Sequence, residues 1–173
     1  MFSSITIRKP LSADIERGEY LSRAAGCMSC HTNVEEAGML LTGGRPINSP
    51  YGVFYSTNIT PDRLTGIGTW SDDDFIKALR HGRSPEGKPY YPVFPYLSYA
   101  KMRNQDILDI KAYLFAQKPI LKKNLEHRLR FPFFDLGSNH PSRQFSAAVH
   151  LVDLKFRPFH HRTSAPQTYQ KFH

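Results

Sequence analysis

Three segments of the chain place hydrophobic residues at helical spacing, and each is predicted to form a helix. The strongest pattern has Ile107, Ile110 and Leu114 at positions i, i+3 and i+7, and Pro119 ends it. Two further segments, 13–25 and 71–81, carry narrower hydrophobic stripes. The pattern therefore predicts a protein whose regular structure is helical.

Residues at the ends of two of these segments support the predicted boundaries. Ser12 and Ser71 stand where a side chain can cap the free N–H groups of a helix, and the acidic run 72–74 suits the positive end of the second helix. Gly26 and Gly82 follow the last helical residues, as C-terminal glycines commonly do. The first helix thus ends directly before the first cysteine of the chain.

The segments between the helices are long and rich in glycine and proline, and the longest runs from 32 to 70. A loop of this length in a compact domain needs additional contacts to hold its conformation, and a large buried ligand would provide them. The only alternating strand pattern is VFYST at 53–57, so no sheet is predicted. We therefore predict an all-α domain with long loops over 12–120, after an N-terminal extension, 1–11. An irregular, basic, His-rich tail is predicted over 121–173.

Charge is distributed unevenly along the chain, which carries a formal net charge of +8. Residues 1–117 hold 13 Lys and Arg against 12 Asp and Glu, whereas 118–173 hold 10 against 3. The near-neutral first part does not suggest nucleic-acid binding. No run of about 18 apolar residues predicts a membrane span, and the first residues lack the apolar core of a secretory signal.

The two cysteines of the chain form one motif with a histidine, Cys27-Met-Ser-Cys30-His31. C-x-x-C-H is the attachment signature of c-type haem, in which two thiols bind the porphyrin and the histidine binds the iron. A structural zinc site usually takes four ligands in two separated pairs, and only one such pair exists here. A thioredoxin-like dithiol should follow a strand rather than a helix. A disulfide would close only a small loop. One covalent haem c is the favoured interpretation, and the dithiol centre is the main alternative.

A low-spin haem takes a second axial ligand, which is commonly methionine. Met28 lies inside the attachment motif and Met39 is only eight residues beyond His31. Met102 follows a loop rich in proline and aromatic residues and precedes the third helix, so it is the predicted ligand. His81, at the end of a helix, is the less favoured choice.

The propionates of an enclosed haem need hydrogen-bond donors. The long loops offer Arg45, Asn58, Thr60 and the indole N–H of Trp70, and these are the predicted propionate contacts. For Trp70, a place in the aromatic core is an equally good interpretation.

Several separate stretches over about 12–120 resemble one family. GEYLSRAAGCMSCHT, GGRPINSPYGVFYSTNITPDRLTGIGTWSDDDFIKALRHG, KPYYPVFPYLSYAKM and DILDIKAYLFAQKP are similar to the first haem domain of multihaem cytochrome c subunits. These subunits belong to bacterial membrane-associated dehydrogenases of the alcohol, gluconate, fructose and nicotinate dehydrogenase type. The resemblance implies a cytochrome c fold, a periplasmic location, a dehydrogenase catalytic subunit as electron donor and a quinone or oxidase as acceptor.

The sequence departs from that family at two points. Phe94 stands where many members carry methionine, although other members have phenylalanine there and a T-K-M run that residues 100–102 resemble. Relatives usually carry three C-x-x-C-H motifs and this chain carries one, with the similarity fading over 129–133. A truncated or frame-shifted chain is the expectation from this second departure.

Two functions follow from these patterns. The favoured one is an electron carrier, because residues 1–120 supply no catalytic base or nucleophile beside the haem. The alternative is a haem enzyme or sensor with an open or displaceable sixth position, which the phenylalanine at position 94 keeps under consideration.

Overall fold

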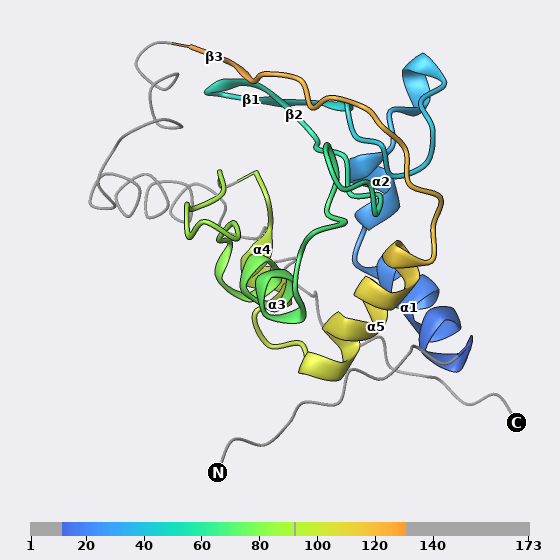
Figure 1. Cartoon of the computed structure of the whole chain (residues 1–173). Helices are drawn as coiled ribbons and strands as arrows, with labels where there is room; N and C mark the ends of the chain where they lie inside the picture. Colours follow the sequence, from blue (N-terminus) through green and yellow to red (C-terminus); the bar gives the residue numbers. More distant parts are fainter. Residues whose placement is uncertain (1–11, 92, 131–173) are drawn as a thin grey trace, which may run out of the picture. The chain divides into compact units, whose positions relative to one another are not determined.

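A computed structural model describes residues 12–91 and 93–130 (Figure 1). The predicted extension 1–11 and most of the predicted tail, 131–173, lie outside the described residues. The segment 121–173 contains six histidines, and five of them lie outside the described residues. His127 is the one that can be placed.

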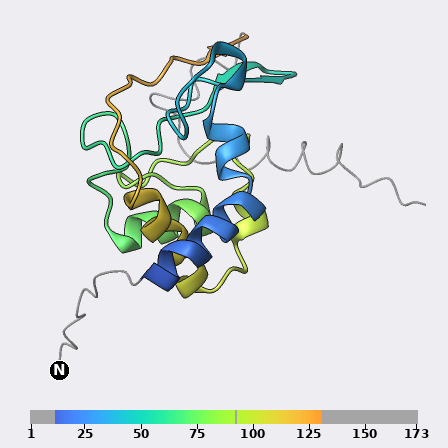
Figure 2. The same ribbon diagram turned by 90° about the vertical axis from the view of Figure 1, so that its right-hand side faces the viewer.

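The first and last helices, α1 (Ser12–Ala24) and α5 (Asn104–Phe115), lie side by side (Figures 1 and 2). Gly18 lets the two backbones approach closely, because a Cβ atom there would lie 1.9 Å from the carbonyl oxygen of Asp109. Arg17 of α1 pairs with Asp109, whose side chain is 1% exposed. Both helices agree with the hydrophobic pattern of the sequence.

Helix α3 (Asp72–His81) begins and ends as its sequence predicts. Ser71 accepts a hydrogen bond from the backbone N–H of Asp74, and the Asp74 carboxylate accepts one from the backbone N–H of Ser71. Gly82 ends the helix in the left-handed conformation with φ 59°. Three shorter helical elements were not predicted individually: α2 (Cys27–His31), the 3-10 helix η1 (Val34–Glu36) and α4 (Tyr96–Tyr99).

The hydrophobic core joins α3 and α5 to two positions of the long loops. Its buried members are Leu41, Ile67, Phe75, Ala78, Leu79, Ile107, Ile110, Tyr113 and Leu114. Met102 and the aromatic residues Phe94 and Tyr99 pack against this core while remaining partly exposed. The helices and the loop between 32 and 70 therefore share one hydrophobic interior.

A small antiparallel sheet corrects the expectation of a purely helical fold. Strands β1 (Pro46–Ser49), β2 (Gly52–Tyr55) and β3 (Arg128–Leu129) pair in the order β1-β2-β3. The alternating stretch 53–57 overlaps β2, but β1 contains proline and polar residues and shows no strand pattern of its own. The extended conformation of β1 comes from its pairing with β2. A hydrophobic pattern along the chain does not reveal such pairing.

Residues 120–130, here called the return segment, are held by the loop before α3 and by the sheet. The Asn58 amide Nδ2 donates to the carbonyl of Ile120 at 2.8 Å, and the Asn58 backbone N–H donates to Asn124 Oδ1 at 2.7 Å. At its end, β3 pairs with β2. The sequence placed the start of an irregular tail at 121. Instead, 121–130 belong to the folded unit, because polar side chains of the loop, which hydrophobic patterns ignore, bind them.

None of the helices in the described ranges is long and apolar enough to cross a membrane.

Candidate haem attachment site

The C-x-x-C-H motif forms a separate short helix, α2 (Cys27–His31), just after α1. Gly26 lies between the two helices with φ 75°, a left-handed conformation that favours glycine. Helical spacing brings Cys27, Cys30 and His31 to neighbouring positions of one turn. Both thiols are free. The local sequence thus presents two sulfurs and one imidazole together at the end of α1.

The His31 ring is oriented by a backbone carbonyl from the long loop. Its Nδ1 lies 2.7 Å from the carbonyl oxygen of Thr57. A carbonyl only accepts hydrogen bonds, so Nδ1 carries the proton and Nε2 keeps a lone pair. Burial lowers the pKa of His31, and the imidazole therefore stays neutral at neutral pH. A neutral ring whose second nitrogen is fixed by an outer partner is the arrangement found at metal-ligating histidines.

The same surroundings argue against a dithiol redox centre. Burial raises the pKa of Cys27 to about 11, which keeps its thiol protonated at neutral pH. A redox-active C-x-x-C pair needs the opposite change, because the thiolate is the reacting species. Within 12–91 and 93–130, no three His, Cys, Asp or Glu side chains converge closely enough to hold a metal ion by themselves.

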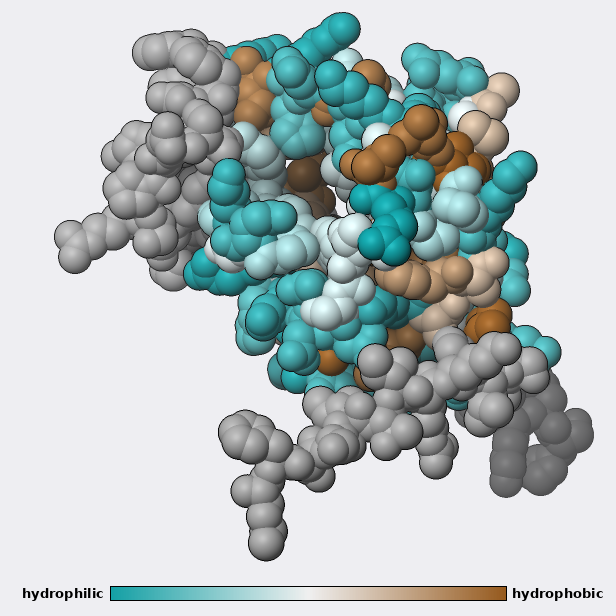
Figure 3. Space-filling view, viewed as in Figure 1, coloured by the Kyte–Doolittle hydropathy of each residue, from teal (hydrophilic) through white to brown (hydrophobic). Residues whose placement is uncertain are grey.

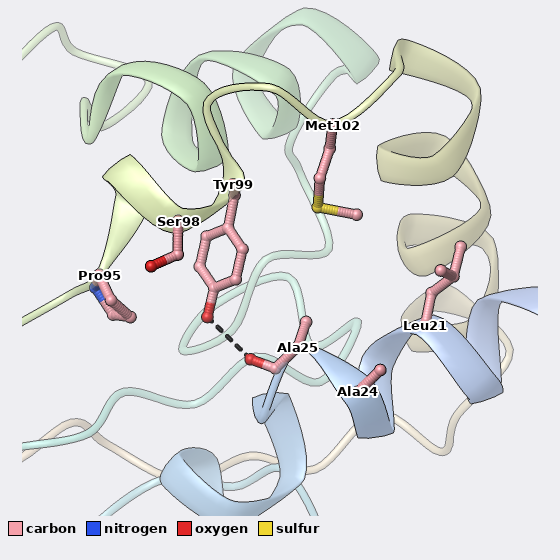
Figure 4. A pocket seen from close by; sticks show the side chains of 7 residues that line it. All are labelled: Leu21, Ala24, Ala25, Pro95, Ser98, Tyr99 and Met102. Carbon is pink, nitrogen blue, oxygen red and sulfur yellow. Dashed lines mark hydrogen bonds between the residues drawn. The ribbon is translucent and has the colours of Figure 1, made fainter. Parts of the chain in front are cut away.

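Met102 lies at a pocket between α1 and α4 of about 430 Å³ (Figure 4). The pocket is lined by Leu21, Ala24, Ala25, Pro95, Ser98, Tyr99 and Met102. Figure 4 shows the Met102 thioether extending into the space between Tyr99 and α1. Figure 3 shows a small hollow on the face of the molecule seen in Figure 1, with hydrophobic groups inside it. The predicted sulfur ligand is therefore next to apolar open space.

The phenylalanine at position 94 occupies a different environment. Phe94 packs edge-on against Tyr90 with ring centroids 5.7 Å apart, and against Tyr99 at 5.9 Å. It thus completes an aromatic cluster beside the core. Of the two positions that the sequence raised, only 102 brings a ligating atom to the pocket.

The residues predicted to contact the propionates form hydrogen bonds with different parts of the protein. These bonds do not gather the four side chains at one place. Asn58 is 2% exposed, and its amide is engaged by the Thr65 side chain and the Ile120 carbonyl. Arg45 donates to the carbonyl of Ser29, inside α2. Thr60, 1% exposed, bonds to Asn58.

The remaining predicted contact, Trp70, packs against Phe75 with ring centroids 6.4 Å apart. His81, the less favoured ligand, is exposed at the end of α3. The hydrogen bonds and ring contacts of the four predicted propionate residues help to organise the long loops. The contact of these four residues with a haem propionate stays a prediction.

The donor set fits a covalently attached haem. Two free thiols lie one helical turn apart, and a neutral imidazole beside them keeps Nε2 for a metal. The Met102 thioether adjoins a largely apolar pocket, whose lining includes none of Cys27, Cys30 and His31. Its role as second iron ligand stays a prediction. Sequence reasoning identified the side chains but missed the Thr57 carbonyl, because a backbone acceptor has no residue-type signal.

These features define a c-type haem protein. The chain belongs to the cytochrome c family, whose sequence profile matches residues 15–117. It is 44% identical over 126 residues to a diheme cytochrome c-type protein of Cereibacter sphaeroides. It is 40% identical over 132 residues to the gluconate 2-dehydrogenase cytochrome c subunit of Pantoea cypripedii, and 43% over 120 residues to the fructose dehydrogenase cytochrome subunit of Gluconobacter japonicus.

The similarity covers most of this chain but a minority of each relative. The matches span 71%, 76% and 69% of this chain, and 43%, 30% and 24% of the three relatives in the same order. The family resemblance inferred from the sequence is thereby confirmed. The cytochrome c fold and covalent haem c are confirmed with it.

Proposed function

We propose that the chain carries single electrons through one covalently attached haem c and is not itself a catalyst. The observation that carries this proposal is the hydrogen bond between His31 Nδ1 and the Thr57 carbonyl, on the helix that also presents Cys27 and Cys30. This bond leaves Nε2 free to bind iron. The cytochrome subunits among the relatives support the same function.

Each residue has a distinct part in the proposal. Cys27 and Cys30 form the two thioether bonds, and His31 is the proximal ligand, held in one orientation by Thr57. Met102 supplies the sixth ligand. The haem supplies a one-electron iron couple when bound. The apolar residues around Met102 exclude water and favour the less charged, reduced state, which raises the potential.

We further propose that Arg45, Asn58 and Trp70 lie on the propionate side of the haem. Arg45 supports this best, because it already reaches the carbonyl of Ser29 within the attachment helix. Arg45→Gln should shift the midpoint potential, whereas Arg63→Gln, at an exposed position of the next loop, should not. Equal potentials in both variants would remove Arg45 from the site.

For the physiological role, we propose a dehydrogenase catalytic subunit as the electron donor and a quinone or an oxidase as the acceptor. Three relatives are named as cytochrome subunits of gluconate, fructose and alcohol dehydrogenases, which supports such a donor. The periplasm is the proposed location, because it follows from the family resemblance. Reduction of the purified cytochrome by a candidate catalytic subunit and its sugar or alcohol substrate tests this part separately.

The central experiment measures haem attachment and ligation in the protein matured in cells that attach haem c. We expect one haem per chain that stays bound after denaturation and acidic acetone extraction. Cys27→Ser and Cys30→Ser should each retain haem through one bond, and the double variant should release it. Release of haem from the unmodified chain would contradict covalent attachment.

The visible spectrum then separates the electron carrier from an open-site haem protein. A methionine-ligated ferric haem shows a weak long-wavelength charge-transfer band, and its iron is low-spin. We expect both features. A high-spin spectrum without that band would favour the enzyme or sensor instead.

A further inference from the structure

Arg80, in the last turn of α3, contacts the backbone at Met102. Its Nη2 donates to the Met102 carbonyl oxygen at 2.5 Å. Its Nε is buried and has no hydrogen-bond partner among the described residues. No carboxylate within 12–91 and 93–130 forms an ion pair with this guanidinium. The chief partner of this partly buried cation is therefore one backbone carbonyl.

A partly buried guanidinium without a carboxylate is costly, since its charge loses water without gaining a counter-ion. Arg17 and Arg103 differ from Arg80 in this respect, because both pair with Asp106. Arg45 and Arg83 also donate to backbone carbonyls, but neither of them contacts residue 102. The hydrogen bond to the Met102 carbonyl therefore gives Arg80 a specific role beyond packing.

The backbone at Met102 is held on both sides. The Met102 N–H donates to the Tyr99 carbonyl at 2.9 Å, and the Met102 carbonyl accepts from Arg80. Tyr99 is itself bound to α1, because its hydroxyl donates to the Ala25 carbonyl at 2.8 Å. With both backbone groups engaged, the Cα–Cβ direction of Met102 is set. The thioether then has only its own side-chain rotations left.

From these contacts we infer that Arg80 is a positioning residue that keeps Met102 on the haem iron and so keeps the sixth position closed to other ligands. The inference rests on the proposed role of Met102 as sixth ligand. A thioether binds iron weakly, so a small displacement of its backbone lets a stronger ligand compete. The Arg80 contact opposes that displacement from a separate helix.

The test measures the affinity of the ferric holoprotein for imidazole, which competes with a thioether for the sixth position. Arg80→Gln keeps a polar group but is too short to make the same contact. We expect it to bind imidazole about tenfold to a hundredfold more tightly, the range for a lost hydrogen bond from a charged donor. Its charge-transfer band should weaken. Arg80→Lys, which keeps the charge and a donor, should restore part of both properties.

Arg83→Gln is the matched control, because Arg83 is exposed and donates to the Gly87 carbonyl at 2.9 Å in the adjoining turn. Its imidazole affinity should match that of the unmodified protein. An affinity of Arg80→Gln within about twofold of that of Arg83→Gln would overturn the inference. If Arg80→Gln does not fold with haem, Arg80→Met, which keeps a long side chain but has no donor, takes its place, and an unchanged imidazole affinity in that variant overturns the inference.

A double-variant cycle separates positioning from general loosening of the fold. In a Met102→Ala background the sixth position is already open, so Arg80→Gln should change imidazole affinity little further. An equal increase in both backgrounds would show that Arg80 acts on structure alone and would overturn the inference. If Met102→Ala by itself leaves the spectrum unchanged, the ligand assignment of the proposed function fails instead.

Discussion

Tyr99 and Ala25 are 74 positions apart in the chain, and a hydrogen bond of 2.8 Å joins the Tyr99 hydroxyl to the Ala25 carbonyl. Ala25 precedes the attachment helix by two residues, and Tyr99 precedes Met102 by three. The bond therefore connects the two segments that carry the proposed ligands on opposite sides of the haem. Burial raises the pKa of Tyr99 to about 12, so its hydroxyl keeps the proton it donates.

Tyr99→Phe tests the contribution of this bond. The variant removes one donor and leaves the Ala25 carbonyl without it, so we expect the free energy of unfolding to fall by about 1 kcal/mol. Denaturant unfolding of the holoprotein measures the change. Tyr20→Phe is the control, because Tyr20 lies on α1 and is 71% exposed. Equal stabilities of the two variants would contradict the prediction.

Gly18→Ala tests the contact between α1 and α5. Alanine normally favours a helix by about 1 kcal/mol relative to glycine, but here its Cβ would lie 1.9 Å from the Asp109 carbonyl oxygen. The helices must separate, and we expect a loss of about 1–3 kcal/mol or more of unfolding free energy. Glu16→Ala, at an exposed position of the same helix, should change stability by less than about 0.5 kcal/mol. A stabilised Gly18→Ala protein would show that the helices do not approach so closely.

Met102→Ala tests the sixth ligand. The variant should keep its covalent haem and lose the charge-transfer band, and its midpoint potential should fall by on the order of 0.1 V. Met39→Ala is the control, because it makes the same substitution at a surface position where Met39 is 56% exposed. It should leave spectrum and potential unchanged. His31→Ala, by contrast, should prevent a folded haem centre from forming.

We expect the contacts of His127 to stabilise the return segment by an amount that depends on pH. Its Nδ1 accepts a hydrogen bond from the Tyr55 backbone N–H at 3.2 Å, and its ring packs on Phe54 and Tyr91. Burial lowers the pKa of His127, so the folded protein favours the neutral ring. The unfolded chain binds a proton at the ordinary pKa of about 6.5. This contribution is therefore complete above that value and is lost as pH falls through the lower pKa of the folded state.

The measurement compares unfolding free energies of the unmodified protein and of His127→Phe between pH 7 and about pH 5. The unmodified protein should lose more stability over this range, because the variant has no ring to protonate at that position. His31 is common to both proteins, so its titration cancels in the difference. Parallel pH profiles would refute the prediction.

Local sequence determined the helices and the attachment motif. Hydrophobic spacing predicted α1, α3 and α5, and the Ser71–Asp74 capping box and Gly82 marked the ends of α3. These features depend on residues within one or two turns of each other, so they can be read along the chain. The adjacent Cys27, Cys30 and His31 identified haem for the same reason.

Contacts between distant segments decided the rest. The strand β1 exists only through pairing with β2, and the return segment is held by Asn58, more than 60 positions before it. The Thr57 carbonyl orients His31 across 26 positions, and Arg80 reaches Met102 across 22. Such hydrogen bonds often use backbone groups, which every residue carries and no residue type reveals. The sequence by itself therefore determined which groups are proposed to bind the haem, and the tertiary structure decided how those groups are held.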